Sequence, residues 1–403
     1  MNTALGYLGN IPDGWNLVHL GRLTSEVRTL NSNCSETNDL QFKMGNIISK
    51  STGDSKYHPE TLEEYTIVAP GDVVVNGLNL NYDLKSLRVG QVRENGVITS
   101  SYIIVRPEKI DADYVKYLLQ GFDSIKTFHG MGKGIRLTLG YEELRRMYIP
   151  VPPPLEQSRI ATFLDEHCGK IDEAIAKYKA LIDKLDEYRK AVITEAVTKG
   201  VRGKSVFNRV PIKHVARYNL ESLPESTPKD FEFDYVDISS VSYEKGVETK
   251  ERMMFENAPS RARRQVKPND VIISTVRTYL KAVAQIPAFE TPLIVSTGFI
   301  VMTAIESKIM PSYLGYAVKS ERFIDDVQVG SYGISYPAIK VSELVNMKID
   351  LPTIAEQQEI VAYLDEKCAA IDATKERHAQ LMAKLEEYKK SLIYNSVTGK
   401  IEC

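Results

Sequence analysis

The feature that most constrains the fold is an internal repeat. Residues 156–198 align with residues 356–398 at an offset of 200 without a gap, and 18 of the 43 positions are identical. The flanking regions repeat more faintly, as where residues 71–75 resemble residues 269–273. Because this period is far longer than that of a solenoid repeat, the chain is a duplication of a two-part unit. We expect the order globular, helical, globular, helical, with pseudo-twofold symmetry.

The repeated segments predict two coiled-coil helices. Apolar residues recur every seven positions in both copies, and such a stripe needs a partner helix. The seam residues are Leu164, Ile171, Tyr178, Leu185 and Val192 in the first copy, and Leu364, Ile371, Leu385 and Leu392 in the second. The first helix leaves the first globular region, and in a pseudo-symmetric molecule the second must return towards it. We therefore expect the two helices to pair antiparallel.

The globular regions have a mixed pattern. Short strand-like runs such as 72–75 and 271–274 alternate with polar loops, and helical stretches at 113–120 and 312–319 interrupt them. We predict an α+β fold class, with two globular regions separated by a pair of long antiparallel helices. The predicted boundaries are 1–150 and 204–350 for the globular regions, and 151–203 and 351–403 for the helical spacers.

The bulk composition narrows the class of protein. No apolar run is long enough to cross a membrane, and the N-terminus lacks the pattern of a secretory signal. The four cysteines have neither zinc-ligand nor disulfide-framework spacing, so we expect a reducing, cytoplasmic location. The formal net charge of −2 argues against a non-specific nucleic-acid coat, which depends on phosphate neutralisation, but it allows local basic clusters.

Motifs for catalysis are missing from the sequence. It contains neither a GxxxxGK[ST] phosphate loop nor a methyltransferase motif of the Asn-Pro-Pro-aromatic or Asp-Pro-Pro-Tyr type. The glycine-rich stretches 129–134 and 330–333 do not follow a buried strand of a Rossmann-like unit. The six histidines include no pair at metal-ligand spacing. We expect no catalytic residue, no metal site and no cofactor in this chain.

Clusters of cationic and amide side chains, of the kind that can contact nucleic acid, are clearest in the second globular region. Reading a sequence requires side chains that reach base edges, with others that hold phosphates. Four cations fall within seven residues, namely Arg261, Arg263, Arg264 and Lys267. The polar loop after the next strand adds Arg277, Tyr279 and Lys281. A solvated charge run is the alternative interpretation of this cluster.

The first globular region has a less basic counterpart. The loop after its strand at 72–75 is rich in amides and includes Asn76, Asn79, Asn81 and Lys85. Lys133 and Arg136 lie in the glycine-rich segment, where small residues allow a close approach to phosphate, and the second copy has Tyr332 there. A connecting loop without a binding role is the alternative for both segments.

The helical segments open with a motif that carries a family resemblance. Residues 152–157 and 352–357 both read Pro-x-x-x-Glu-Gln, and Leu-Asp-Glu follows at 164–166 and 364–366. The N-terminal segment Pro12-Asp13-Gly14-Trp15 is also similar to that family's opening. With two variable regions of about 150 residues, the chain resembles the specificity (S) subunit of Type I restriction–modification complexes, the HsdS family, over essentially its whole length.

The resemblance implies a division of labour. Each globular region would be a target-recognition domain that reads one half of a split, asymmetric site in double-stranded DNA. The paired helices would fix the gap between the half-sites and dock two methyltransferase subunits, and two restriction/motor subunits would join them. S-adenosylmethionine, ATP and Mg would act in those partners. The alternatives are a coiled-coil scaffold or adaptor with no DNA role, and a self-contained restriction or modifying enzyme, which the missing motifs disfavour.

Overall fold

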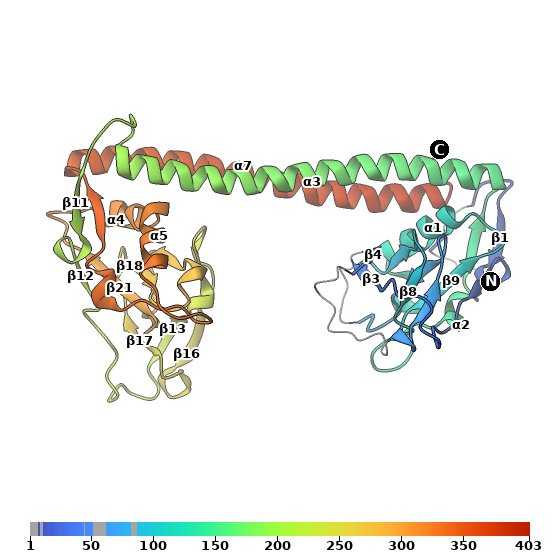
Figure 1. The fold of residues 1–403 in the computed structure, drawn as a ribbon, viewed down its shortest axis with the longest axis horizontal. Helices are drawn as coiled ribbons and strands as arrows, with labels where there is room; N and C mark the ends of the chain where they lie inside the picture. The colour runs from blue at the N-terminus through green and yellow to red at the C-terminus, as the bar shows by residue number, and fades with distance from the viewer. Residues whose placement is uncertain (1–6, 9–10, 44, 51–61, 82–86) are drawn as a thin grey trace. The chain divides into compact units, whose positions relative to one another are not determined.

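The computed structural model describes residues 7–8, 11–43, 45–50, 62–81 and 87–403, and its described part forms two compact units. The first unit comprises Met1–Tyr178 and Gln380–Cys403, and the second comprises Lys179–Ala379. Two long helices, α3 (Pro154–Lys199) and α7 (Ile354–Val397), each contribute one part to each unit. The predicted α+β class with two long helices is confirmed (Figure 1).

The first unit is built on a four-stranded sheet in the order β2-β9-β6-β7. Smaller strand pairs are β1-β10, β3-β4 and β5-β8. The strands are β1 (Asn16–His19), β2 (Thr24–Glu26), β3 (Leu40–Lys43), β4 (Asn46–Ser49), β5 (Thr66–Val68), β6 (Val73–Val75), β7 (Val89–Gln91), β8 (Gly96–Ile98), β9 (Ile103–Pro107) and β10 (Tyr148–Val151). The helices are α1 (Ala112–Ser124) and α2 (Tyr141–Leu144).

The second unit repeats this plan with a sheet in the order β12-β21-β18-β19 and adds a second four-stranded sheet, β16-β13-β20-β17. Two further strand pairs are β11-β22 and β14-β15. The strands are β11 (Asn208–Pro211), β12 (Ala216–Tyr218), β13 (Glu232–Val236), β14 (Val241–Ser242), β15 (Gly246–Val247), β16 (Glu251–Met254), β17 (Ala262–Gln265), β18 (Val271–Ser274), β19 (Val283–Gln285), β20 (Leu293–Ser296), β21 (Phe299–Ala304) and β22 (Lys348–Leu351). The helices are α4 (Pro311–Ala317), α5 (Glu321–Val329) and α6 (Val341–Leu344).

The central strands of the two main sheets are equivalent. Val73 pairs with Val105 in β9, and Val271 pairs with Met302 in β21, both in antiparallel register. Strands β6 and β18 are fully buried, which explains their uninterrupted apolar sequence. In each unit the core extends from this sheet through a helix, α1 or α4, to apolar side chains of α3 and α7.

Within each unit, α3 and α7 pack together and run antiparallel. In the first unit, the Asp172 carboxylate accepts a hydrogen bond of 2.6 Å from Lys389 Nζ. In the second unit, Asp186 pairs with Lys375 and Arg189 pairs with Asp372. In the second unit, the partner's number on α7 falls as the number on α3 rises, as the repeat predicts.

The predicted seam residues lie on the packed faces of these helices. Leu164, Ile171 and Leu392 are buried in the core of the first unit, and Val192 and Leu364 are buried in that of the second. Ile371 is also buried, whereas Tyr178, Leu185 and Leu385 are half-buried. Burial is deepest near the ends of the helices because the globular parts cover them there.

A buried tyrosine in each unit fastens a short helix to a strand and to one of the two long helices. The hydroxyl of Tyr114 in α1 lies 2.9 Å from the carbonyl oxygen of Pro150 and 3.2 Å from that of Val397. In the second unit, the hydroxyl of Tyr313 in α4 lies 2.8 Å from the carbonyl oxygen of Asp350 and 3.2 Å from that of Val197. A hydroxyl has one proton to donate, so it is shared between two backbone acceptors in each unit.

The glutamine of each Pro-x-x-x-Glu-Gln motif is a second fastening. Gln157 is buried, and its side-chain oxygen accepts from the Asp111 backbone N–H at 2.9 Å, while its amide donates to the Pro152 carbonyl at 2.8 Å. Gln357 accepts from Met310 N–H at 2.8 Å and donates to the Pro352 carbonyl at 2.9 Å. The motif therefore fixes where each long helix leaves its sheet.

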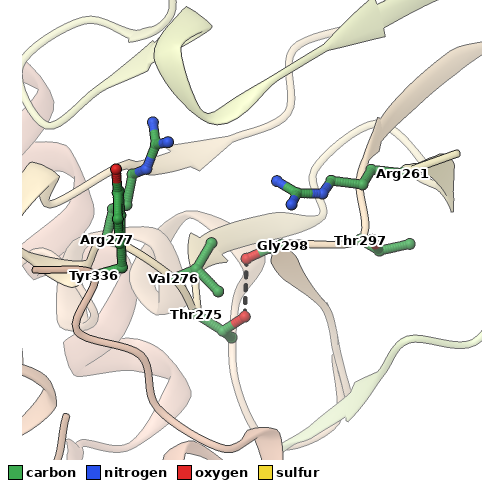
Figure 2. A pocket seen from close by; sticks show the side chains of 7 residues that line it. All are labelled: Arg261, Thr275, Val276, Arg277, Thr297, Gly298 and Tyr336. Atoms are coloured by element: carbon green, nitrogen blue, oxygen red, sulfur yellow. Dashed lines mark hydrogen bonds between the residues drawn. The ribbon is translucent and has the colours of Figure 1, made fainter. Parts of the chain in front are cut away.

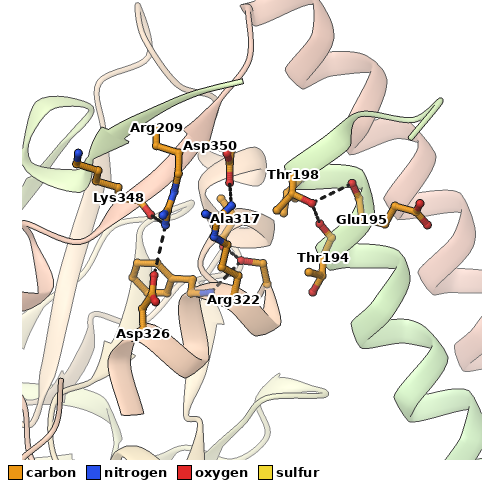
Figure 3. Close-up of polar contacts among 12 residues, drawn as sticks. Thr194, Glu195, Thr198, Arg209, Ala317, Arg322, Asp326, Lys348 and Asp350 are labelled. Atoms are coloured by element: carbon orange, nitrogen blue, oxygen red, sulfur yellow. Dashed lines mark hydrogen bonds and ion pairs between the residues drawn. The ribbon is translucent and has the colours of Figure 1, made fainter. Parts of the chain in front are cut away.

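Polar contacts complete this attachment in the second unit (Figure 3). Arg209 of β11 donates to the Lys348 carbonyl at 2.8 Å and pairs with Asp326 of α5 at 3.3 Å. Glu321 N–H, in the first turn of α5, donates to the hydroxyl of Thr194 in α3 at 2.9 Å. Strand pair, short helix and long helix are thus joined by hydrogen bonds as well as by apolar packing.

Candidate nucleic-acid interface

A pocket of about 500 Å³ opens at the end of β18 in the second unit. It is lined by Arg261, Thr275, Val276, Arg277, Thr297, Gly298 and Tyr336. These residues come from the loop after β18, the turn between β20 and β21, the start of β17 and the segment before α6. Figure 2 shows the guanidinium groups of Arg261 and Arg277 on opposite sides of this pocket.

The backbone around the pocket is held by short hydrogen bonds. The Thr275 hydroxyl donates to the Gly298 carbonyl at 2.9 Å, and Thr297 N–H donates to the Arg261 carbonyl at 2.8 Å. Arg277 has a left-handed backbone with φ of 51°, and its guanidinium lies 5.3 Å from the centroid of the Tyr336 ring. Two guanidinium groups with several donors each suit guanine edges or phosphate oxygens.

The structure does not bring the four clustered cations of this region together. The guanidinium of Arg263 lies 4.6 Å from the centroid of the Phe255 ring, and Lys267 pairs with Glu221 at 2.6 Å. Arg264 is half-buried, and burial lowers its pKa. Of the four, only Arg261 lines the pocket. Neighbouring residues of a strand point to opposite faces, and an irregular register between Ala262 and Arg264 in β17 disperses the cluster further.

The remaining predicted residues of this region lie in the loop beyond Arg277 and in the later hairpin. Tyr279 and Tyr332 are exposed, and Lys281 is half-buried with a positive φ of 50°. Tyr336, which the sequence places in the same segment as Tyr332, lies in the pocket beside Arg277.

The equivalent loop of the first unit has a different side-chain chemistry. Asn79 follows Val75 at the distance at which Arg277 follows Ile273, and its φ of 50° matches the 51° of Arg277. Asn76 accepts a hydrogen bond of 3.1 Å from Leu78 N–H through its side chain. Asn81 donates to the Ile135 carbonyl at 3.2 Å. Lys85, also predicted here, lies outside the described residues.

Arg88 is a residue of this loop that the sequence analysis missed. It is buried, and its guanidinium donates to the carbonyl oxygens of Asn76 at 3.1 Å, Leu78 at 2.8 Å and Asn79 at 3.3 Å. Its backbone N–H donates to the buried carboxylate of Asp123 at 2.9 Å. Arg88 therefore holds the amide-rich loop from inside, and a single arginine before a strand gives no sequence signal for this role.

The basic residues of the glycine-rich segment lie at the surface. The Lys133 ammonium group donates to the Glu143 carboxylate at 2.6 Å and holds the pKa of that carboxyl below its usual value. Arg136 is exposed. Across the described ranges, no group of three or more His, Cys, Asp or Glu residues could hold a metal ion, and no helix is long and apolar enough to span a membrane.

Comparisons with known proteins agree with this architecture. A family model described as "Type I restriction modification DNA specificity domain" matches residues 256–383. The MjaVIII specificity subunit of a Type I restriction enzyme from Methanocaldococcus jannaschii is 21% identical, over 97% of this chain and 94% of its own length. The EcoDI specificity subunit of Escherichia coli is 22% identical, over 74% of this chain and 72% of its own length.

The fold is also found in solved structures. A chain from work described as "Structural basis underlying complex assembly and conformational transition of the type I R-M system" has a TM-score of 0.72 and 16% identity, over 97% of this chain and 100% of its own length.

Two α+β units, each fastened to parts of the same two long helices, define a duplicated two-part architecture. Residues 256–383 match the Type I restriction modification DNA specificity domain, and the chain is similar over nearly its whole length to Type I specificity subunits, which form a non-catalytic family. The description of the matching family model gives that domain a role in DNA specificity.

Proposed function

We propose that the chain directs a Type I complex to a bipartite, asymmetric site in double-stranded DNA, with each unit reading one half-site. The observation that carries this proposal is the pair of equivalent loops after β6 and β18. Asn79 and Arg277 share a position and a backbone conformation, yet one is an amide and the other a guanidinium. Amides suit adenine edges and guanidiniums suit guanine edges. Different side chains on one framework support two different half-sites.

In this proposal α3 and α7 form the spacer that sets the gap between half-sites and dock two methyltransferase subunits. Support comes from Tyr188 and Tyr388, which are exposed on these helices at an offset of 200. Each unit contains one of them, as two equivalent docking positions require. Two restriction/motor subunits complete the complex, and S-adenosylmethionine, ATP and Mg belong to these partners.

The test is to express the chain with its methyltransferase subunits in a host without other methylation and to map methylated sites across the genome. We expect one split motif whose halves are unrelated and separated by a fixed gap. If no bipartite motif is enriched, the chain acts as a scaffold without a reading role, and the proposal is rejected.

The assignment of one half-site to each unit is tested by Arg277→Asn. Asparagine tolerates the left-handed backbone that Arg277 adopts, so the fold should be unaffected. We expect one half of the methylated motif to relax at one base pair, with a loss of about 1–3 kcal/mol of discrimination, and the other half to stay unchanged. A change in both halves, or in neither, contradicts the assignment.

A further inference from the structure

A short hairpin in each unit lies against the loop that follows β6 or β18. This loop, which carries Asn79 or Arg277, is called the reading loop below. In the first unit, Lys133 and Thr138 exchange backbone hydrogen bonds of 3.0 and 2.9 Å, which close a loop of residues 134–137. In the second unit, Tyr332 and Ala338 exchange two bonds of 2.9 Å, which close a loop of residues 333–337. The two hairpins are equivalent although their loops differ by one residue.

Each hairpin is joined to the reading loop by the same backbone contacts. Leu139 N–H donates to the Gly77 carbonyl at 2.9 Å, and Ile339 N–H donates to the Thr275 carbonyl at 2.8 Å. Gly77 permits this approach, because a Cβ atom at that position would lie 2.4 Å from the Leu139 carbonyl oxygen. The hairpin tips are therefore held in a fixed relation to Asn79 and Arg277.

Both tips present a bare isoleucine. Each loop starts with Gly-Ile, in which Gly134 and Gly333 have positive φ values of 76° and 110°. The side chain of Ile135 is 95% exposed, and that of Ile334 is fully exposed. Turn positions favour polar residues or glycine, and an isoleucine in water adds nothing to the core. A single exposed apolar residue needs no explanation, but the same residue at the same tip of two diverged copies does.

Cationic side chains surround the tip of the first hairpin, and tyrosine side chains surround the tip of the second. Arg136 follows Ile135 directly and is exposed, and Lys133 lies at the base of the same hairpin. In the second unit, Tyr332 and Tyr336 flank Ile334 and are exposed, and Tyr336 packs beside Arg277. An apolar tip surrounded by such groups matches a DNA groove, where cations contact phosphates and an apolar side chain enters between base pairs.

We propose that Ile135 and Ile334 are wedges that enter a base-pair step of their own half-site and partly unstack it. Insertion gives the isoleucine the apolar contact that it lacks in the free protein, and a step that unstacks easily is then preferred. The hairpins would thus add specificity for DNA deformability to the direct contacts of the reading loops. This inference rests on the proposed function, because it requires each unit to bind a half-site.

The test uses the chain in complex with its methyltransferase subunits and duplexes that carry the methylation-defined target. A fluorescent base analogue, 2-aminopurine, replaces bases one at a time in each half-site, and its fluorescence rises where a step is unstacked. The variants are Ile135→Ser and Ile334→Ser. Val206→Ser is the matched control, since Val206 is 96% exposed but lies between α3 and β11, away from the hairpins.

We expect the wild-type complex to brighten the analogue at one step in each half-site. Each isoleucine variant should lose this signal in one half-site only. The half-site that loses the signal should differ between the two variants. Each variant should bind the target about tenfold more weakly (1.4 kcal/mol per tenfold). The Val206 variant should behave as wild type. The wedge is rejected if the isoleucine variants match the wild type in fluorescence and affinity on a target that the wild type binds. It is also rejected if either variant alters the signal in both half-sites. In both cases the proposed function stands. If wild type selects no bipartite target, the proposed function itself fails.

Discussion

At the scale of single residues, position in the fold rather than charge separates the candidate DNA contacts from structural cations. Arg261 and Arg277 lie in one pocket, whereas the Arg263 guanidinium packs on Phe255 and Lys267 is paired with Glu221. In the first unit, the guanidinium of the buried Arg88 donates its hydrogen bonds to backbone carbonyls of its own loop. Equal charges in one stretch of sequence thus have unequal access to a ligand.

This difference predicts unequal salt effects for two neighbouring arginines. Replacing Arg261 with alanine should weaken DNA binding and lower the slope of log affinity against log salt by about 0.9, because one phosphate contact is lost. Arg263→Ala is the matched control and should leave the slope unchanged, since its guanidinium lies on the Phe255 ring. Equilibrium binding across a salt series measures both. An altered slope for Arg263 alone would contradict the pocket assignment.

At the scale of elements, the start of each long helix is fixed by a buried glutamine amide and by a tyrosine hydroxyl. Gln357 satisfies the Met310 N–H and the Pro352 carbonyl, and its equivalent Gln157 makes matching contacts in the first unit. The hydroxyls of Tyr316 and Tyr117 add hydrogen bonds of 2.6 and 2.5 Å to the carboxylates of Asp365 and Asp165. These contacts explain why the Glu-Gln motif appears twice.

Removing this amide should destabilise the second unit. Gln357→Ala leaves a buried N–H and a buried carbonyl without their partner, which costs about 1–3 kcal/mol. Gln358→Ala is the control, because Gln358 is the same residue type one position later and is exposed. Denaturant unfolding of the two variants measures the difference. Equal stabilities would show that the amide does not fasten the helix.

A half-buried lysine in the same unit predicts a pH dependence of stability. Burial, together with the charge of Arg189, lowers the pKa of Lys319 to about 8. Its ammonium group lies 5.7 Å from the Tyr243 ring centroid, near Asp372 and Glu244. Because the folded-state pKa lies below that of the unfolded chain, about 10.4, the charged lysine opposes folding below pH 8, and this cost fades between these two values.

Lys319→Met should therefore raise the melting temperature by a few degrees at pH 7. The gain should shrink as the pH rises above 8, because the wild-type amine is then neutral in the folded state. Lys340→Met, at an exposed lysine, is the control. Melting curves from pH 7 to 10 measure the trend, and a gain that stays constant or grows with pH would contradict it.

The helices and their direction could be predicted from the sequence, whereas the site could be predicted only in part. Heptads and an ungapped repeat define α3 and α7 because side-chain spacing on a helix is regular. The loops are harder, since the offset between copies is 198 at Asn79 and Arg277 but 199 at Ile135 and Ile334. The two glycine-rich segments can be matched as equivalents, but small insertions obscure which of their residues correspond. The cations at 261–267 were predicted to act together, but proximity in the sequence does not show which way the side chain of a strand residue points.

At the scale of the whole molecule, the antiparallel helices allow a test of the spacer. Deleting residues 176–182 and 376–382 removes one heptad from each helix at equivalent positions and keeps the Asp172–Lys389 pair in register. Each helix shortens by about 10 Å. We expect the methylated motif to keep both halves but to have a shorter gap, by about three base pairs at about 3.4 Å each. An unchanged gap would contradict the spacer role.

The tyrosine fastening has one more consequence. The hydroxyls of Tyr114 and Tyr313 bond to backbone carbonyls of the strand and the helix that they join. Main-chain acceptors are present whatever the local side chains, so this fastening requires only a tyrosine at the equivalent position of the globular module that is placed on the helices. Recombination could therefore exchange the globular module of either unit independently. The number of possible targets would then grow as the square of the number of available modules.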